Sequence, residues 1–211
     1  MTVGLETRLM RRAPMQRRST ERVDRMLDVC AMLLDQVGYE ALTTKAIAEK
    51  AGISIGSVYQ YFPDKKSMVR ALAVRYLDEF VQRLDQAFAG APLQDWRQLV
   101  DAMLRVYADM LEDSPGFRAI RIGPAQDPYI MRPDEDNATV IAGATRELFR
   151  GQVALPAGSH AETILVIALT MGDALLQLAY RRDPAGDREI LAELATAVTR
   201  YLNQELPLPA G

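Results

Sequence analysis

The chain has 211 residues, of which 49% are hydrophobic and 25% are charged, and its formal net charge is −3. This length allows one large or two small domains with a substantial core, and the composition is typical of a soluble globular protein. One cysteine excludes an intrachain disulfide and favours a reducing compartment. No signal-like apolar run follows the N-terminal arginines, and the apolar stretch 164–180 is short for a bilayer span, so we expect a cytoplasmic protein.

Charge is distributed unevenly along the chain. Residues 1–70 contain 12 Lys and Arg against 8 Asp and Glu, whereas residues 71–211 contain 13 basic against 20 acidic residues. A polyanion would therefore meet the first third of the chain and be repelled by the rest. Residues 1–18 carry five arginines without apolar periodicity. We expect a disordered arm there, either a solvated tail or a segment that follows DNA phosphates.

Apolar residues recur at helical spacing along the chain, and no strand pattern survives, so we predict an all-α fold. The first helix is expected from Ser19 or Thr20 to Val37, with Gly38 as its stop. Cys30 lies on the apolar stripe of this helix, which favours a core residue over a redox sensor. Further helices are expected over residues 64–88, 93–112, 117–122, 133–151, 159–182 and 187–204.

The most informative segment is 43–65, which is typical of two short helices joined at a glycine. Thr43 or Thr44 can cap the first helix, Gly52 suits the positive φ of its end, and Ser54 can cap the second helix. The apolar positions at helical spacing are Ile47, Ala48 and Ala51 in the first helix and Val58 and Tyr61 in the second. This pattern predicts a helix-turn-helix, whose second helix can enter a DNA major groove.

The alternative reading of this segment is an ordinary helical hairpin in an all-helical protein. Gly56 argues against it, because a glycine in the first turn of a helix costs about 1 kcal/mol relative to alanine. Such a glycine makes sense where backbone must approach another surface closely. The outer face of the second helix is expected to consist of Ile55, Gly56, Ser57, Tyr59 and Gln60.

Residues 43–65, together with the preceding Gly38-Tyr39-Glu40-Ala41-Leu42, resemble the DNA-binding domain of TetR-family transcriptional regulators. The matching pattern is Thr-Thr, Ile-Ala, Ala-Gly, Gly-Ser, aliphatic-Tyr, Tyr-Phe and Asp-Lys. It covers about residues 20–75, and beyond it only length and helical character agree. The resemblance implies a three-helix DNA-binding domain over 19–66 and a helical ligand-binding and dimerisation domain over 67–211. The long helix from residue 64 would transmit effector binding between them.

The resemblance also suggests how this chain would contact DNA. Hydroxyl and ammonium groups of Thr44, Ser57, Tyr59 and Lys65 would hold phosphates. Ile55, Gly56 and Gln60 would face base edges, where Gln60 can read adenine and Ile55 can touch a thymine methyl. The full expected set of DNA-binding residues is Thr43, Thr44, Lys45, Ser54, Ile55, Gly56, Ser57, Tyr59, Gln60, Tyr61 and Lys65.

The last two helices are the expected site of dimerisation. Residues 163–180 carry apolar groups on more than one face, as a helix does when it is central in its domain or pressed against another chain. In the TetR family these helices form a four-helix interface between two subunits, and a dimer suits a palindromic operator. The expected interface residues are Ile164, Ala168, Gly172, Leu175, Leu191, Leu194 and Val198.

An effector pocket is implied by the resemblance rather than by any motif. Its candidate residues, each of which also fits a simple core position, are Trp96, Met103, Tyr107, Met110, Phe117, Arg121, Tyr129, Phe149, Met171 and Gln177. We find no catalytic constellation: His160 has no metal-ligating partners, and the acids at 134–136 suit a helix N-terminus better than a metal site. We therefore expect no enzyme activity, no cofactor and no metal.

These observations predict a dimeric transcriptional regulator, more specifically a repressor, that binds a palindromic operator and is released by a small-molecule effector. The alternative is an effector-independent DNA-binding protein whose C-terminal domain only dimerises. A helical enzyme is a third reading, for which the sequence offers no starting residue.

Overall fold

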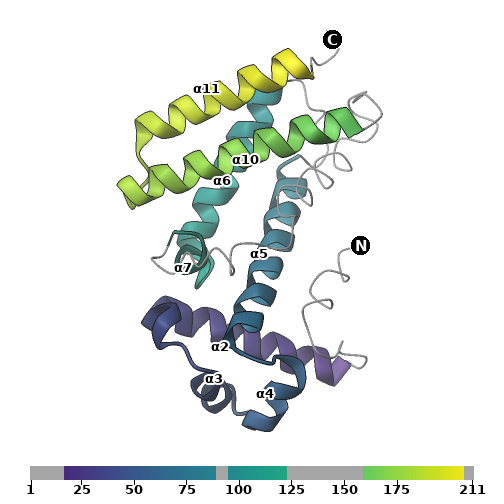
Figure 1. The fold of residues 1–211 in the computed structure, drawn as a ribbon, viewed down its shortest axis with the longest axis vertical. Coiled ribbons are helices and arrows are strands. Elements are labelled where there is room, and N and C mark those ends of the chain that lie inside the picture. Colours follow the sequence, from purple (N-terminus) through teal and green to yellow (C-terminus); the bar gives the residue numbers. More distant parts are fainter. Residues whose placement is uncertain (1–16, 89–94, 123–158, 207–211) are drawn as a thin grey trace. The chain divides into compact units, whose positions relative to one another are not determined.

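The computed structural model describes residues 17–88, 95–122 and 159–206. This part of the chain contains eight helices and no strand, which confirms the all-α prediction (Figure 1). The helices are α2 (Arg17–Ala41), α3 (Thr44–Ala51), α4 (Ile55–Tyr61), α5 (Lys65–Ala87), α6 (Trp96–Asp113), α7 (Phe117–Arg121), α10 (Ser159–Arg182) and α11 (Arg188–Glu205).

The helix boundaries follow the expected ones closely. Gly38 interrupts α2 as expected, with φ 72° and ψ 175°, although a final helical turn follows it to Ala41. Asp187 caps α11, since its Oδ1 accepts hydrogen bonds from the amides of Glu189 and Ile190 at 3.1 and 3.2 Å. The expected arm, apart from its last two residues, and the expected helix over 133–151 lie outside the described residues.

The chain divides into two compact units, each built from separate stretches of sequence. Among the described residues, the first unit comprises 17–79 and 110–122, and the second comprises 80–88, 95–109 and 159–206. The end of α6 and the whole of α7 therefore fold with the helix-turn-helix segment. The domain boundary expected after residue 66 stays a prediction, because this division follows packing rather than chain order.

Within the first unit, the turn between α6 and α7 packs tightly on α2. Gly116 has φ 76°, and a Cβ added to it would lie 2.6 Å from the carbonyl oxygen of Ala31. The Tyr76 hydroxyl donates to the carbonyl of Pro115, and the Tyr76 ring meets the Phe117 ring edge to face at 5.3 Å. At position 116, only glycine combines a positive φ with so close an approach to the Ala31 carbonyl oxygen.

The second unit is organised around α10 and α11, which lie side by side and are joined by a short turn (Figure 1). Trp96, at the start of α6, is fully buried, and its indole N–H donates to the carbonyl of Leu206 at 2.6 Å. Farther along α6, the ring of Tyr107 lies 5.8 Å from that of Tyr180 on α10. Aromatic groups of α6 thus meet the end of α11 and the end of α10.

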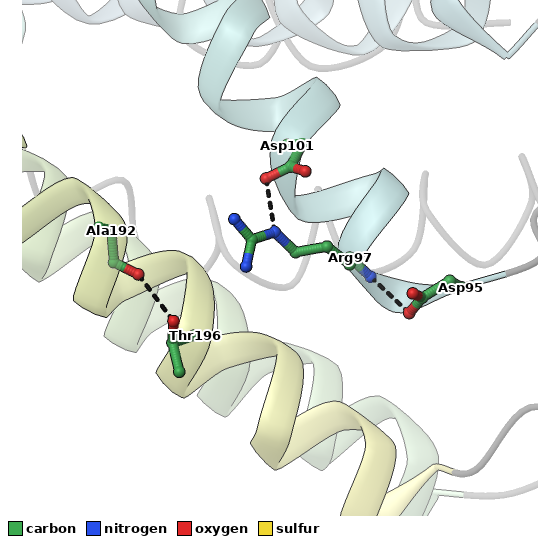
Figure 2. Close-up of polar contacts among 5 residues, drawn as sticks. All are labelled: Asp95, Arg97, Asp101, Ala192 and Thr196. Carbon is green, nitrogen blue, oxygen red and sulfur yellow. Dashed lines mark hydrogen bonds and ion pairs between the residues drawn. The ribbon is translucent and has the colours of Figure 1, made fainter.

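Local polar contacts define the start of α6 and satisfy a hydroxyl on α11 (Figure 2). Asp95 precedes α6 and accepts a 2.9 Å hydrogen bond from the amide of Arg97, as a helix cap does. The Arg97 side chain pairs with Asp101 one turn later at 2.8 Å. On α11, Thr196 donates its hydroxyl to the carbonyl of Ala192 at 2.9 Å, which satisfies the hydroxyl within the helix.

Candidate nucleic-acid interface

The first helix of the predicted helix-turn-helix begins as its sequence indicates. Thr43 is extended, with φ −133° and ψ 147°, and its hydroxyl oxygen accepts a 3.1 Å hydrogen bond from the amide of Ala46. Thr43, rather than Thr44, is therefore the cap of α3. The expected inner face is confirmed, because Ile47, Ala48 and Ala51 are all buried.

The turn between α3 and α4 depends on Gly52, which adopts φ 66° and ψ 36°. Its amide donates to the carbonyl of Glu49 at 3.2 Å, and the amide of Ile53 donates to that of Ala48 at 3.0 Å. These bonds satisfy carbonyls that the end of α3 would otherwise leave without partners. No atom lies within 4 Å of a Cβ added at Gly52, so its positive φ, and not space, requires glycine.

The second helix, α4, is capped by Ser54, whose hydroxyl oxygen accepts from the amide of Ser57 at 3.2 Å. The two serine hydroxyls also lie 2.8 Å apart. Val58 and Tyr61 are buried and pack the helix against the rest of the first unit. Tyr61 was expected among the DNA contacts, but only 7% of it is exposed, so it does not share the exposed face of α4.

The opposite side of α4 is open to solvent. Ile55 and Tyr59 are exposed to 41% and 45%, which is high for large apolar side chains. Gly56 and Gln60 are also exposed, and a Cβ added at Gly56 would meet nothing within 4 Å. Packing inside the protein therefore does not explain this glycine. We call Ile55, Gly56, Tyr59 and Gln60 the exposed face of α4.

A polar contact joins this face to the start of α3. The hydroxyl oxygens of Thr44 and Tyr59 lie 3.3 Å apart. Lys45 is one residue further along α3 and is 81% exposed, with its ammonium 3.9 Å from the carboxylate of Glu49. Two hydroxyls thus meet at the exposed face of α4, and an exposed ammonium lies near the start of α3; both kinds of group commonly bind phosphate.

Lys65 is held inside the first unit by groups that sequence reasoning did not connect with it. Its ammonium donates to the backbone carbonyls of Tyr39 at 2.9 Å and Glu40 at 3.1 Å. It also lies 4.5 Å from the centre of the Tyr39 ring. Tyr39 and Lys65 both belong to the pattern that carries the family resemblance, but nothing local to either residue indicates that they meet.

Two ionisable groups of α2 reflect its packing in the first unit. Burial raises the pKa of the Cys30 thiol to about 12, so the side chain is a neutral core thiol at physiological pH. Burial also raises the pKa of Asp24, an effect that the nearby Arg75 guanidinium opposes. In the described part of the chain, no group of three or more His, Cys, Asp or Glu residues is arranged to hold a metal ion.

The expected dimer residues lie along one side of each helix and differ in how deeply the second unit buries them. Ile164, Ala168, Leu194 and Val198 are buried inside the second unit itself, whereas Gly172, Leu175 and Leu191 are half-buried. The large apolar side chains that α10 does expose are Ile167, at 46%, and Leu178, at 38%. Sequence reasoning did not identify Ile167 and Leu178 as exposed, because α10 is apolar on most sides.

The expected pocket residues are divided between the two units. In the second unit, Trp96 and Tyr107 are buried and Met103, Met171 and Gln177 are half-buried, with the Gln177 amide donating to Asp173 at 2.8 Å. Met110, Phe117 and Arg121 belong to the first unit. Met110 and Phe117 are buried there, and Arg121 is half-buried. Tyr129, Phe149 and the acids at 134–136 lie outside the described residues. His160 is exposed in the first turn of α10.

Two family profiles match the chain. Residues 26–72 match the profile described as bacterial regulatory proteins, tetR family, and residues 94–206 match the tetracyclin repressor-like C-terminal domain. The chain therefore belongs to the tetR family of bacterial regulatory proteins, and it is a transcriptional regulator with a helix-turn-helix DNA-binding domain. The α3–α4 geometry described above lies within the first of these two matched regions.

Individual relatives agree with this assignment. A TetR-family transcriptional regulator from Streptomyces coelicolor has a similar structure, with a TM-score of 0.73, 34% identity, and coverage of 88% of this chain and 99% of that one. The transcriptional repressor KstR of Mycolicibacterium smegmatis is 31% identical over 40% of this chain and 43% of its own length. The chain thus spans less than half of that curated relative.

A third relative has a ligand in its structure. RolR in complex with resorcinol shares the fold, with a TM-score of 0.56, 19% identity, and coverage of 90% of this chain and 96% of that one.

By length and composition, His160–Arg182 of our chain is long and apolar enough to span a membrane, and it is longer than the apolar stretch expected from the sequence. TetR-family regulators are nevertheless soluble DNA-binding proteins, and length and composition alone are weak evidence for a membrane span.

Proposed function

We propose that this regulator is a repressor that binds a palindromic operator as a homodimer and leaves it when a small molecule binds. The observation that carries the proposal is the exposed face of α4, which two buried residues, Val58 and Tyr61, hold in a fixed orientation. Ile55 and Tyr59 expose apolar surface there without an internal partner to explain it. A recognition helix needs such a face to enter a major groove.

The side chains around this face suit two kinds of DNA contact. Thr44 and Tyr59 bring two hydroxyls within 3.3 Å of each other, close enough to share one phosphate, and Ser57 adds a third hydroxyl near the start of α4. Gln60 is exposed and carries the amide that can pair with adenine, and Ile55 can pack on a thymine methyl. Phosphate contacts would set the register, and Ile55 and Gln60 would choose the sequence.

The exposed side of α10 supports a homodimer. Only 28% of its most apolar window is buried in the chain, although its composition is that of a core helix. Ile167 and Leu178 are three helical turns apart and point to the same side, and half-buried Met171 and exposed Ala174 lie between them. A second copy is the fitting occupant of this stripe, because two recognition helices must be held about one DNA turn apart.

Release by an effector is the third element of the proposed function. It is supported by family membership and by a relative of the same fold that binds resorcinol. An effector would act by preferring the dimer state whose recognition helices no longer match the operator, which is a shift between two populations. The repressor assignment follows the KstR similarity.

Selection of bound sequences from random DNA tests the DNA-binding part. We expect two inverted half-sites whose centres lie about one helical turn apart. The Gln60→Ala variant should change the preferred base at one position of each half-site. Identical motifs from both proteins would refute the role of Gln60, and an unsymmetrical site would refute the dimeric operator.

A thermal-shift screen of small aromatic and lipophilic compounds tests the effector, with loss of operator binding as the second readout. A compound that stabilises the protein and releases DNA supports the proposal. If no compound does either, the second candidate gains support, namely an effector-independent DNA-binding protein whose second unit only dimerises. Its supporting observation is that Trp96 and Tyr107 are already fully packed core residues.

A further inference from the structure

The C-terminal end of α2 lacks a cation of its own. No basic residue lies in its last turn, and Gly38 breaks the helical conformation just before it. The carbonyl groups at the end of a helix carry a partial negative charge, and a nearby lysine, arginine or charged histidine normally balances it. The carbonyls concerned here are those of Tyr39 and Glu40.

Lys65 supplies this cation from 26 residues away in the sequence. Its ammonium donates to the Tyr39 carbonyl at 2.9 Å and to the Glu40 carbonyl at 3.1 Å, and it lies 4.5 Å from the centre of the Tyr39 ring. An ammonium has three N–H donors, so two of them are used by carbonyls while the charge also faces the aromatic ring.

The backbone of Lys65 is itself well anchored. It begins α5, whose start is closed by a reciprocal pair: the amide of Ser67 donates to Asp64 Oδ1 at 2.7 Å, and the Ser67 hydroxyl oxygen accepts from the amide of Asp64 at 3.3 Å. The side chain therefore extends from a fixed helix start to the end of another helix. Placing a cation at its own helix N-terminus is unfavourable, so the contact with α2 is what stabilises Lys65 there.

The contact reaches the helix-turn-helix through the backbone of residues 39–43. The Tyr39 carbonyl that accepts from Lys65 also accepts from the amide of Leu42 at 3.2 Å. Leu42 is buried, with 1% exposed, and the next residue, Thr43, caps α3. Lys65 thus holds one side of the turn that delivers Thr43 and Thr44 to the start of α3.

We propose that Lys65 is a positioning residue of the DNA-binding unit, which fixes the turn before α3, and that it is not a ligand of DNA phosphate. To bind a phosphate, the ammonium would have to leave two carbonyls and an aromatic face. This inference rests on the proposed DNA-binding function, and it replaces the phosphate role expected from the sequence.

Salt dependence of operator binding separates the two roles. A lysine that neutralises a phosphate contributes about 0.9 to the slope of log K against log salt, whereas a positioning residue affects affinity at every salt concentration alike. We expect Lys65→Met to weaken operator binding by tenfold or more with a nearly unchanged slope. Lys45→Met is the charge-matched comparison, since it removes an 81% exposed ammonium near the start of α3. A slope that falls by about 1 for Lys65→Met would overturn the inference.

Amide hydrogen exchange of the free protein tests the role of Lys65 independently of operator binding. In Lys65→Met, we expect the Leu42 and Ala46 amides to exchange with solvent about tenfold faster, because both depend on the turn that Lys65 holds. Lys45→Met should leave them unchanged. Unaltered exchange in Lys65→Met would overturn the inference whatever the protein binds.

Two more variants distinguish a positioning role of Lys65 from a phosphate-binding role. Tyr39→Leu removes the ring that faces the ammonium, and its effect on thermal stability should be less than additive with that of Lys65→Met. Lys65→Arg retains the charge and can bind phosphate, but its planar guanidinium does not reproduce the compact ammonium geometry. Full operator affinity in Lys65→Arg would favour a phosphate ligand, and a loss close to that of Lys65→Met would favour positioning.

Discussion

The Thr44 and Tyr59 hydroxyl oxygens lie 3.3 Å apart, so the start of α3 and the exposed face of α4 are linked across 15 residues of sequence. Neither hydroxyl is needed to close a helix, because Thr43 and Ser54 are the caps of α3 and α4. The hydroxyl of the pair that does not donate to the other is therefore available to donate to a DNA phosphate in the proposed complex.

Tyr59→Phe should weaken operator binding by about tenfold or more, because hydrogen bonds to charged groups contribute about 1.5–3 kcal/mol. The ring stays in place, and no charge is lost, so the slope of affinity against salt should be unchanged. Fluorescence anisotropy titrations at several salt concentrations measure both quantities. Equal affinity for Tyr59→Phe and the unmodified protein would remove Tyr59 from the phosphate contacts.

Gly56→Ala should stabilise the free protein and weaken its complex with DNA. Nothing lies within 4 Å of the added Cβ, so the helix gains about 0.5–1 kcal/mol from the loss of glycine flexibility. The same methyl group would stand between α4 and the DNA. Thermal unfolding and operator titration measure the two effects, and a variant that is more stable and binds equally well would contradict the close approach.

Gly52→Ala is the matched contrast for that experiment. Its added Cβ also meets nothing within 4 Å, but φ is 66°, so alanine is strained there. We expect it to destabilise the protein by about 1 kcal/mol, opposite in sign to Gly56→Ala.

Gly116→Ala should destabilise the first unit severely, by roughly 3 kcal/mol or more, because the new Cβ would lie 2.6 Å from the Ala31 carbonyl oxygen at φ 76°. Gly38→Ala has nearly the same φ, 72°, but open space around its Cβ. It should cost only about 1 kcal/mol. Denaturant unfolding of both variants isolates the cost of the close packing, and equal losses would show that the turn relaxes away from α2.

Ile167→Glu should convert the proposed dimer into a monomer, because it places a charge on the exposed apolar stripe of α10. Val37→Glu is the control, since Val37 is a similarly exposed apolar residue, at 49%, on α2 of the first unit. Sedimentation or size-exclusion at micromolar concentration distinguishes a monomer of 23.5 kDa from a dimer of twice that mass. A monomeric unmodified protein would refute the assembly.

Stability should fall with rising pH between about 9 and 12, in part through Cys30. Below pH 9 the thiol is neutral in both the folded and the unfolded chain, whereas above it the unfolded thiol ionises and the folded thiol, with a pKa of about 12, does not. The unfolded state then binds fewer protons, so the free energy of unfolding decreases as pH rises. Cys30→Ala should therefore lose stability less steeply over this range in denaturant titrations.

The same burial protects Cys30 from alkylation. At pH 8 the native protein should react with iodoacetamide far more slowly than the urea-unfolded chain, because only the thiolate is the nucleophile. Comparable rates would contradict the core assignment and revive the redox reading.

Local signals explain why the helix-turn-helix could be predicted so closely. The caps Thr43 and Ser54, the glycine turn at 52 and the inward residues act within one or two helical turns, and each appears in the structure as expected. Tyr61 shows the limit, because the family pattern places it beside DNA-contacting residues whereas the helical period places it inside. The structure follows the period.

Contacts between distant segments could not be predicted in the same way. Lys65 meets Tyr39 across 26 residues, and Gly116 meets Ala31 across the whole of α3, α4, α5 and α6. On α10, apolar residues occur on most sides, so periodicity could not separate Ile164, which the second unit buries, from Ile167, which it exposes. That distinction depends on which neighbouring segments pack against each side of α10.

The amino-acid sequence was sufficient for the all-α fold, the family and the two short helices that would meet DNA, because helix caps, glycine turns and apolar spacing act between near neighbours. The tertiary structure decided which charges and faces remain available. It engages the ammonium of Lys65 with the end of α2 and leaves one stripe of α10 uncovered. These outcomes depend on which segments meet in space, and burial and charge pairing arise only when they do.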